Sequence, residues 1–173
     1  MTDRARFTIV VMGVAGCGKS TVGAALADQL GVHFVDGDDL HPASNVAKMR
    51  SGTPLTDDDR WPWLDAVGTV LADAFAHPDG VVVACSALRR QYRERIRSAS
   101  PQARFLLLAV SPAVATARLA ARGGHFMPAS LIASQFATLE LPAADERDVT
   151  VLDAAMPLPA LIAQAADATL PVR

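Results

Sequence analysis

Residues 13–20 read Gly-Val-Ala-Gly-Cys-Gly-Lys-Ser and lie between an apolar run and a helical pattern. This is the G-x-x-x-x-G-K-[ST] pattern of a phosphate-binding loop. Its glycines let successive backbone N–H groups turn toward one point, and the start of the following helix adds partial positive charge there. In this chemistry Lys19 reaches the β- and γ-phosphates, and the Ser20 hydroxyl can ligate Mg²⁺. We therefore expect ATP to bind at Gly13, Val14, Ala15, Gly16, Cys17, Gly18, Lys19, Ser20 and Thr21.

The use of lysine supports this prediction. The chain has 16 cationic side chains, and only Lys19 and Lys48 are lysines. A lysine ammonium is a compact point charge that fits among phosphate oxygens. A sequence that otherwise uses arginine thus keeps lysine where the phosphates are expected.

A second polar cluster spans residues 36–60. Asp36, Asp38 and Asp39 come directly after an apolar run. Phosphoryl transfer needs a metal ion and a carboxylate that orients the attacking hydroxyl and accepts its proton. We expect Asp36 and Asp38 in these roles, whereas Asp39 fits equally well as part of an acidic turn that caps the next helix.

Further side chains of this cluster can meet a polar substrate. His41 and Asn45 can donate hydrogen bonds, although lone residues of these types more often cap helices or lie at the surface. Lys48 and Arg50 lie on or beside one short predicted helix, and the scarcity of lysine makes Lys48 the more suggestive. The three aspartates at 57–59 are interpreted as a solvated helix start, where the helix dipole favours acidic residues.

Two groups of arginines follow later strands. Arg118 and Arg122 are four residues apart on one helical face and precede two glycines. Arginines beside a glycine hinge are typical of a closing lid, here residues 118–130, that neutralises charge on a transferring phosphoryl group. A pair of solvated helix arginines is the alternative. Of the five arginines after the third predicted strand, most are expected to face solvent, which leaves Arg89 and Arg90 as anion ligands.

The elements that position these residues alternate along the chain. Strands are expected at residues 7–12, 33–35, 81–85, 105–110 and 149–152, and helices at 19–30, 42–49, 57–76, 88–98, 112–122, 129–139 and 158–170. Strands separated by crossover helices imply an α/β fold with a parallel sheet covered on both faces. Ligands of such sheets bind at the carboxyl ends of the strands, where several of the polar clusters fall.

The length and composition of the chain limit the number of domains and the kinds of partner that it can have. At 173 residues, with 51% hydrophobic and 20% charged residues, the chain is expected to fold as one domain, residues 1–173. A net charge of −2 offers no basic field for nucleic acid, and no apolar run approaches the roughly 18 residues of a membrane span. Two cysteines without ligand spacing, and no apolar signal region, favour a cytoplasmic location.

Taken together, these segments resemble the gluconokinases of the small P-loop sugar-acid kinase family. The phosphate loop alone marks only the superfamily, but the longer segments are specific and span nearly the whole chain. They are residues 13–20, 36–42 with 45 and 48–49, 52–60 with 62–64, 85–88 with 92–93, and 122–127 with 134–136 and 139–140.

This resemblance implies a reaction and a fold. The reaction is ATP-dependent phosphorylation of D-gluconate at its 6-hydroxyl with Mg²⁺, giving 6-phospho-D-gluconate and ADP. The fold is that of an adenylate-kinase-like P-loop NTPase, with a five-stranded parallel sheet of order 2-3-1-4-5, flanking helices and a mobile lid. The resemblance also implies a homodimer.

Residue roles follow from the same resemblance. Lys19 and Ser20 would hold the phosphates and the metal ion. By similarity to related shikimate kinases, Asp36 would lie near Mg²⁺, and Asp38 would act as the base at the acceptor hydroxyl.

Arginines and lid residues complete the expected site. Arg122 would act in catalysis and Arg118 at ATP, while the cation that binds the substrate carboxylate stays open among Arg60, Arg89 and Lys48. The expected substrate contacts are Asp38, His41, Lys48, Arg60, Arg89, His125 and Gln135.

The departures from the family pattern are small. Cys17 occupies a loop position that is often serine, and Leu141 precedes the proline that follows Glu140. A thiol at the start of a helix would be sensitive to alkylation if the helix lowered its pKa, which is a hypothesis for Cys17.

Two other functions remain open at this point. A small-molecule kinase of the same fold could act on shikimate or a nucleotide, although few aromatic residues near segment 36–60 are available to stack a base. A non-catalytic, nucleotide-gated binding module would need neither Asp38 nor the lid arginines.

Overall fold

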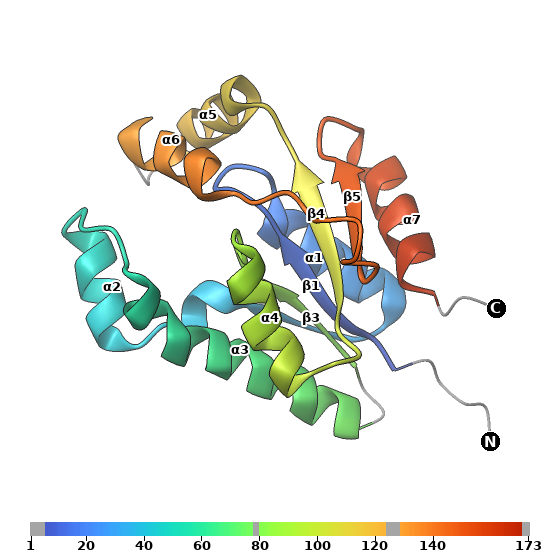
Figure 1. The fold of residues 1–173 in the computed structure, drawn as a ribbon. Coiled ribbons are helices and arrows are strands. Elements are labelled where there is room, and N and C mark those ends of the chain that lie inside the picture. The colour runs from blue at the N-terminus through green and yellow to red at the C-terminus, as the bar shows by residue number, and fades with distance from the viewer. Residues whose placement is uncertain (1–5, 78–79, 124–128, 171–173) are drawn as a thin grey trace, which may run out of the picture.

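The strands of the structure run in one direction. The computed structural model describes residues 6–77, 80–123 and 129–170. Within them, five strands form one parallel sheet of order β2-β3-β1-β4-β5 (Figure 1). The strands are β1 Thr8–Met12, β2 His33–Asp36, β3 Val81–Ala84, β4 Arg104–Ala109 and β5 Val149–Asp153. The expected sheet and its strand order are confirmed.

The helices also follow the predicted pattern. They are α1 Lys19–Leu30, α2 Ala43–Arg50, α3 Asp57–Ala76, α4 Arg90–Ala99, α5 Pro112–Ala121, α6 Ala129–Thr138 and α7 Leu158–Thr169, with a 3-10 turn η1 Gly37–Leu40. The bounds of α1 and α3 are those predicted, and the others differ by one or two residues. No helix among these residues is long and apolar enough to cross a membrane.

Each face of the sheet has its own hydrophobic core. On one face α1 and α7 pack against the strands through Leu26 and Leu161, and on the other α3 and α4 pack through Leu64 and Ile96. Strands buried on both faces need apolar side chains at successive positions, which explains runs such as Phe-Leu-Leu-Leu in β4. The resulting layers hold the sheet rigid beneath the loops that follow its strands (Figure 1).

The start of α3 is fixed by a capping box. The Thr56 hydroxyl accepts a hydrogen bond from the Asp59 backbone N–H at 3.2 Å, and the Asp59 carboxylate accepts one from the Thr56 N–H at 2.8 Å. Such reciprocal bonds satisfy two N–H groups that a helix start leaves without partners. Thr56 is therefore the residue that caps this helix.

The turn after β2 lies directly against the end of β3. Asp36 pairs with Ala84 in the sheet, and a Cβ atom on Gly37 would lie 2.3 Å from the Ala84 carbonyl oxygen. The Trp63 indole N–H also donates to the Gly37 carbonyl at 2.7 Å. Glycine is therefore required between Asp36 and Asp38, and it brings both carboxylates close to the end of the sheet.

We expect Gly37→Ala to disturb both stability and the site. The added methyl group meets backbone that cannot yield, so the free energy of unfolding should fall by roughly 1–3 kcal/mol. Because Asp36 and Asp38 flank the residue, kcat/KM for phosphoryl transfer should fall by about 10²-fold, the scale of a 1 Å misplacement. Urea unfolding and steady-state kinetics would measure the two effects.

Gly31→Ala is the matched control. Gly31 ends α1 with a left-handed φ of 66° and has no atom within 4 Å of an added Cβ. Its substitution should cost about 1–2 kcal/mol of stability through backbone strain alone. Equal losses of kcat/KM in the two variants would contradict a specific role of Gly37 in placing the carboxylates.

Candidate active site

A cavity of about 660 Å³ opens at the carboxyl ends of the strands. Its walls come from the phosphate loop, the turn after β2, segment 49–60, and helices α5 and α6. The predicted site residues that line it are Ala15, Gly16, Gly18, Lys19, Ser20, Asp36, Asp38, His41, Arg60, Arg122 and Gln135. Side chains from both ends of the sequence thus meet in one place, as parallel strands require.

The phosphate loop holds its lysine through backbone bonds. The Lys19 ammonium donates to the carbonyl oxygens of Gly13 and Val14, both at 3.1 Å. Gly18 precedes α1 with a left-handed φ of 97°, which turns the chain from the loop into the helix. The ammonium therefore lies at the positive start of α1 and on the cavity wall, where it can meet phosphate oxygens.

Helices α5 and α6 contact the same loop. The Gln135 side-chain oxygen of α6 accepts a hydrogen bond from the Ala15 N–H at 2.6 Å. Arg118 of α5 donates to the carbonyls of Cys17 at 3.2 Å and Ala154 at 2.6 Å. Arg118 does not line the cavity, whereas Arg122 does. Of the two predicted lid arginines, Arg122 is therefore the one positioned to meet a ligand.

Ser20 and Asp36 present oxygen atoms that suit a hard divalent cation. The Ser20 hydroxyl donates to one Asp36 carboxylate oxygen at 2.9 Å, and the other oxygen accepts from the Asp38 N–H at 3.0 Å. The described residues contain no group of three or more His, Cys, Asp or Glu side chains placed to hold a metal. Mg²⁺ commonly binds through one or two protein oxygens together with phosphates and water, and this donor set fits that mode.

Asp38 has the properties of a general base. Asp38 lines the cavity and is exposed to solvent there. Desolvation by the surrounding protein, followed by the nearby charge of Asp36, raises the pKa of Asp38, and Lys19 opposes the rise. A raised pKa strengthens a carboxylate as a proton acceptor near neutral pH.

His41 is held as a neutral hydrogen-bond donor. Its ring stacks on Trp63 with centroids 4.2 Å apart, and its Nδ1 lies 3.1 Å from the Asn45 amide nitrogen. That nitrogen also donates to the Asp59 carbonyl at 2.8 Å, so it is the donor and Nδ1 the acceptor. The ring proton therefore lies on Nε2. Burial, and then the charge of Arg60, lowers the pKa of His41 to about 4.

The three candidate cations for the carboxylate have different environments. Arg60 lines the cavity and donates to the Leu55 carbonyl at 2.6 Å and the Tyr92 hydroxyl at 3.2 Å. Lys48 instead binds both oxygens of Asp59 at 2.7 and 2.8 Å, and neither Lys48 nor Arg89 lines the cavity. The structure thus favours Arg60.

Two interpretations from the sequence need correction. The three aspartates do begin α3 and Asp58 is exposed, but Asp59 caps the helix and pairs with Lys48, and Asp57 accepts from the Tyr92 hydroxyl. Arg90, a predicted anion ligand, forms a bidentate pair with Asp145 at 2.7 and 2.9 Å. Local sequence patterns could not predict that Asp59 pairs with Lys48 or that Asp145 pairs with Arg90.

Some residues of the cavity wall were not among the expected site residues, although several of them lie in the segments that carry the family resemblance. They are Met49, Gly52, Thr53, Pro54, Leu55, Ala84, Ser86, Leu119, Leu131 and Ser134. The glycine–threonine–proline turn after α2 was a usable signal, because such a sequence breaks a helix and returns the chain. His125 and part of the expected lid, residues 124–128, lie outside the described residues.

Comparison with known proteins gives consistent matches. The AAA domain family matches residues 9–142. The gluconokinase of Gluconobacter oxydans (strain 621H) is 49% identical over 143 residues, covering 83% of this chain and 80% of the relative. The thermosensitive gluconokinase of Escherichia coli (strain K12) is 40% identical over 166 residues, covering 96% and 89%. The crystal structure of a gluconokinase from Sinorhizobium meliloti 1021 has 46% identity and a TM-score of 0.85, covering 94% and 91%.

We expect His41 to remain neutral, with its proton on Nε2, from pH 8 to about pH 5. Its pKa lies below the ordinary 6.5, so acid protonates it only near pH 4. Nitrogen-15 NMR of the imidazole rings would show both the tautomer and the titration. Titration of His41 near pH 6.5, or a proton on Nδ1, would contradict this arrangement, and Asn45→Leu should release the tautomer.

Cys17 should resist alkylation in the folded protein. The residue is 1% exposed and packs in the core beneath the loop, so a thiolate there is shielded from reagents. Mass spectrometry after iodoacetamide treatment should find Cys17 unmodified until denaturant is added, and wild type and Cys17→Ser should keep equal activity. Rapid modification of the native protein would restore the hypothesis of a sensitive thiol.

Proposed function

Since the chain belongs to the gluconokinase family and is a kinase, we propose that it transfers the terminal phosphoryl group of ATP to the 6-hydroxyl of D-gluconate. The observation that carries this proposal is one cavity in which Lys19 of the phosphate loop, the Asp38 carboxylate and the Arg60 guanidinium all line the wall. A phosphate-binding group, a base and a carboxylate-binding cation are the parts that this reaction needs.

Residues of the phosphate loop would bind and orient the nucleotide. Backbone N–H groups of the loop and the Lys19 ammonium would hold the β- and γ-phosphates. Ser20 and Asp36 would hold Mg²⁺, which would supply positive charge to offset the negative charge of the phosphates. Arg122, which caps the end of α5 and lines the cavity, would stabilise the charge on the transferring phosphoryl group.

Asp38 would receive the proton of the acceptor hydroxyl. As the 6-oxygen forms its bond to the γ-phosphorus, the bond to the β-phosphate oxygen breaks and leaves ADP. The hydroxyl proton passes to the Asp38 carboxylate, so charge and atoms balance. The raised pKa of Asp38 suits it to this transfer.

Arg60 and His41 would recognise the remainder of the substrate. D-gluconate is a chain with its carboxylate at one end and the 6-hydroxyl at the other, so a cation must lie away from Asp38. A guanidinium has five N–H donors, and the bonds of Arg60 to Leu55 and Tyr92 occupy two of them. His41 would donate through Nε2 to a substrate hydroxyl, and Gln135 would contact another. Family membership also supports a homodimer and a cytoplasmic location as parts of the proposal.

Asp38→Asn should separate chemistry from nucleotide binding. Without a proton acceptor, kcat with D-gluconate should fall by about 10²- to 10⁴-fold, while ATP affinity changes little. In the wild type the acid limb of the kcat/KM profile should lie at higher pH than for an ordinary aspartate, because protonation of Asp38 removes the base. Coupled measurement of ADP release would give both results.

Controls decide between this proposal and its competitors. Asp58→Asn, at an exposed position of the same chain segment, should retain full activity. ATP turnover is compared with D-gluconate, shikimate, nucleoside monophosphates and no acceptor. Turnover with another acceptor would overturn the substrate, and full activity of Asp38→Asn would overturn its role as the base.

A further inference from the structure

Arg93 of α4 is a fully buried charge. Its side chain is 0% exposed and forms a bidentate ion pair with Glu146, from Nε at 2.8 Å and Nη2 at 2.7 Å. The Glu146 side chain is 2% exposed and also accepts from Arg97 at 2.7 Å. These hydrogen bonds, from Arg93 first, hold the pKa of Glu146 at about 2, so the pair stays ionised through the neutral range.

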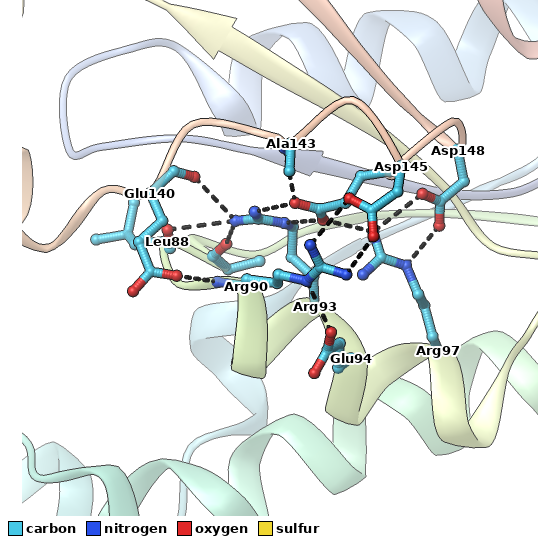
Figure 2. Close-up of polar contacts among 11 residues, drawn as sticks. Leu88, Arg90, Arg93, Glu94, Arg97, Glu140, Ala143, Asp145 and Asp148 are labelled. Atoms are coloured by element: carbon cyan, nitrogen blue, oxygen red, sulfur yellow. Dashed lines mark hydrogen bonds and ion pairs between the residues drawn. The ribbon is translucent and has the colours of Figure 1, made fainter.

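The third guanidinium nitrogen of Arg93 joins two segments of backbone. Nη1 donates long, shared hydrogen bonds to the carbonyls of Ala87 and Leu88 at 3.3 Å and of Glu140 at 3.2 Å. Glu140 adds two bonds of its own: its N–H donates to the Leu88 carbonyl at 2.8 Å, and its carboxylate accepts from the Arg90 N–H at 2.7 Å (Figure 2). One side chain therefore ties the chain after α6 to the chain after β3.

Both of these segments continue into the cavity wall. Ser86, just before Ala87, lines the cavity, and its carbonyl accepts from the Gly13 N–H at 3.3 Å. Upstream of Glu140, helix α6 supplies Gln135, which binds the Ala15 N–H at 2.6 Å. Two short paths thus lead from Arg93 to the phosphate loop, one from each side.

A contribution to stability does not by itself explain why the ion pair of Arg93 and Glu146 is buried. Removing two charges from water is costly, and apolar side chains of similar volume often stabilise a core equally well or better. What an apolar pair lacks is direction, because it cannot bind three carbonyl oxygens in a fixed arrangement. A role in geometry therefore explains the buried pair better than a role in stability.

We propose that Arg93, held by Glu146, is a positioning residue for phosphoryl transfer, which keeps α6 and the loop after β3 seated against the phosphate loop. Arg93 acts through Gln135 and Ser86 and does not itself touch a substrate. The proposal rests on the kinase function proposed above, but not on the identity of the acceptor.

The double variant Arg93→Met/Glu146→Leu tests this inference. It removes both charges together, so no unpaired charge is left buried, and we expect a folded protein with unchanged or higher Tm. Since the seating of α6 is lost, kcat should fall at least tenfold. The KM for the acceptor should change less than kcat, because Asp38, His41 and Arg60 belong to other elements and only Gln135 among the described acceptor contacts lies on α6. Exchange of the Ala15 amide hydrogen should become at least tenfold faster.

A surface pair on the same helix provides the control. Arg95 binds Asp65 with equally short bonds of 2.6 and 2.8 Å, but the two side chains are 47% and 52% exposed. Arg95→Gln/Asp65→Asn should leave kcat and Ala15 exchange unchanged. A folded Arg93→Met/Glu146→Leu protein with kcat within threefold of wild type and unaltered Ala15 exchange would overturn the proposal.

A second variant decides the question if the double variant does not fold. Two glycines inserted between Leu139 and Glu140 leave the buried pair intact but separate α6 from it. The same tenfold loss of kcat is expected, and unchanged kcat would refute the positioning role. All rates are measured with whichever acceptor the wild type phosphorylates. Failure with D-gluconate in the wild type would therefore overturn the proposed substrate, while the comparison of variants would still test Arg93.

Discussion

The common direction of the five strands is the constraint on which the site depends. A parallel sheet places every strand's carboxyl end at one edge, so the loops that follow β1, β2 and β3 must meet there. The phosphate loop, the turn that carries Asp36 and Asp38, and Ser86 each follow one of these strands. The pairing of strands from distant parts of the chain therefore brings these candidate groups together.

The positively charged side chains fall into two groups, those that form ion pairs within the protein and those that remain available to a ligand. Each of the four arginines of α4 pairs with a carboxylate of α3 or of the chain before β5. These arginines are Arg90, Arg93, Arg95 and Arg97. Lys19 differs, since it donates to backbone carbonyls, and no ion pair among the described residues involves it. Its positive charge therefore remains available to phosphates, while the arginines of α4 are neutralised by their partners.

Features that are set by residues close together in the chain could be predicted from the sequence. The phosphate loop, the ends of α1 and α3, and the strand order follow from local patterns and a family resemblance, and the structure agrees with them. The burial of Arg93 was not predictable, because its partner Glu146 lies 53 residues away and no periodicity links the two. The partner of Lys48 was also not predictable. Because lysine is scarce in this chain, Lys48 was expected to contact the substrate, whereas its ammonium pairs with Asp59, 11 residues further along the chain. Pairings of this kind are decided by packing, which a single sequence does not display.

Two separate groups of polar side chains anchor α2 and α6, which both contribute residues to the cavity lining. Lys48 and Asn45 fasten α2 to the start of α3 through Asp59, whereas Arg93 and Glu140 fasten α6 to α4. The hydrogen bonds that anchor α2 and those that anchor α6 thus have no side chain in common. Lys48 and Asn45 share no hydrogen bond with Arg93 or Glu140, so a substitution in one group leaves the bonds of the other group in place. Natural mutation on the α2 side of the cavity can therefore alter that side while the contact between α6 and the phosphate loop is retained.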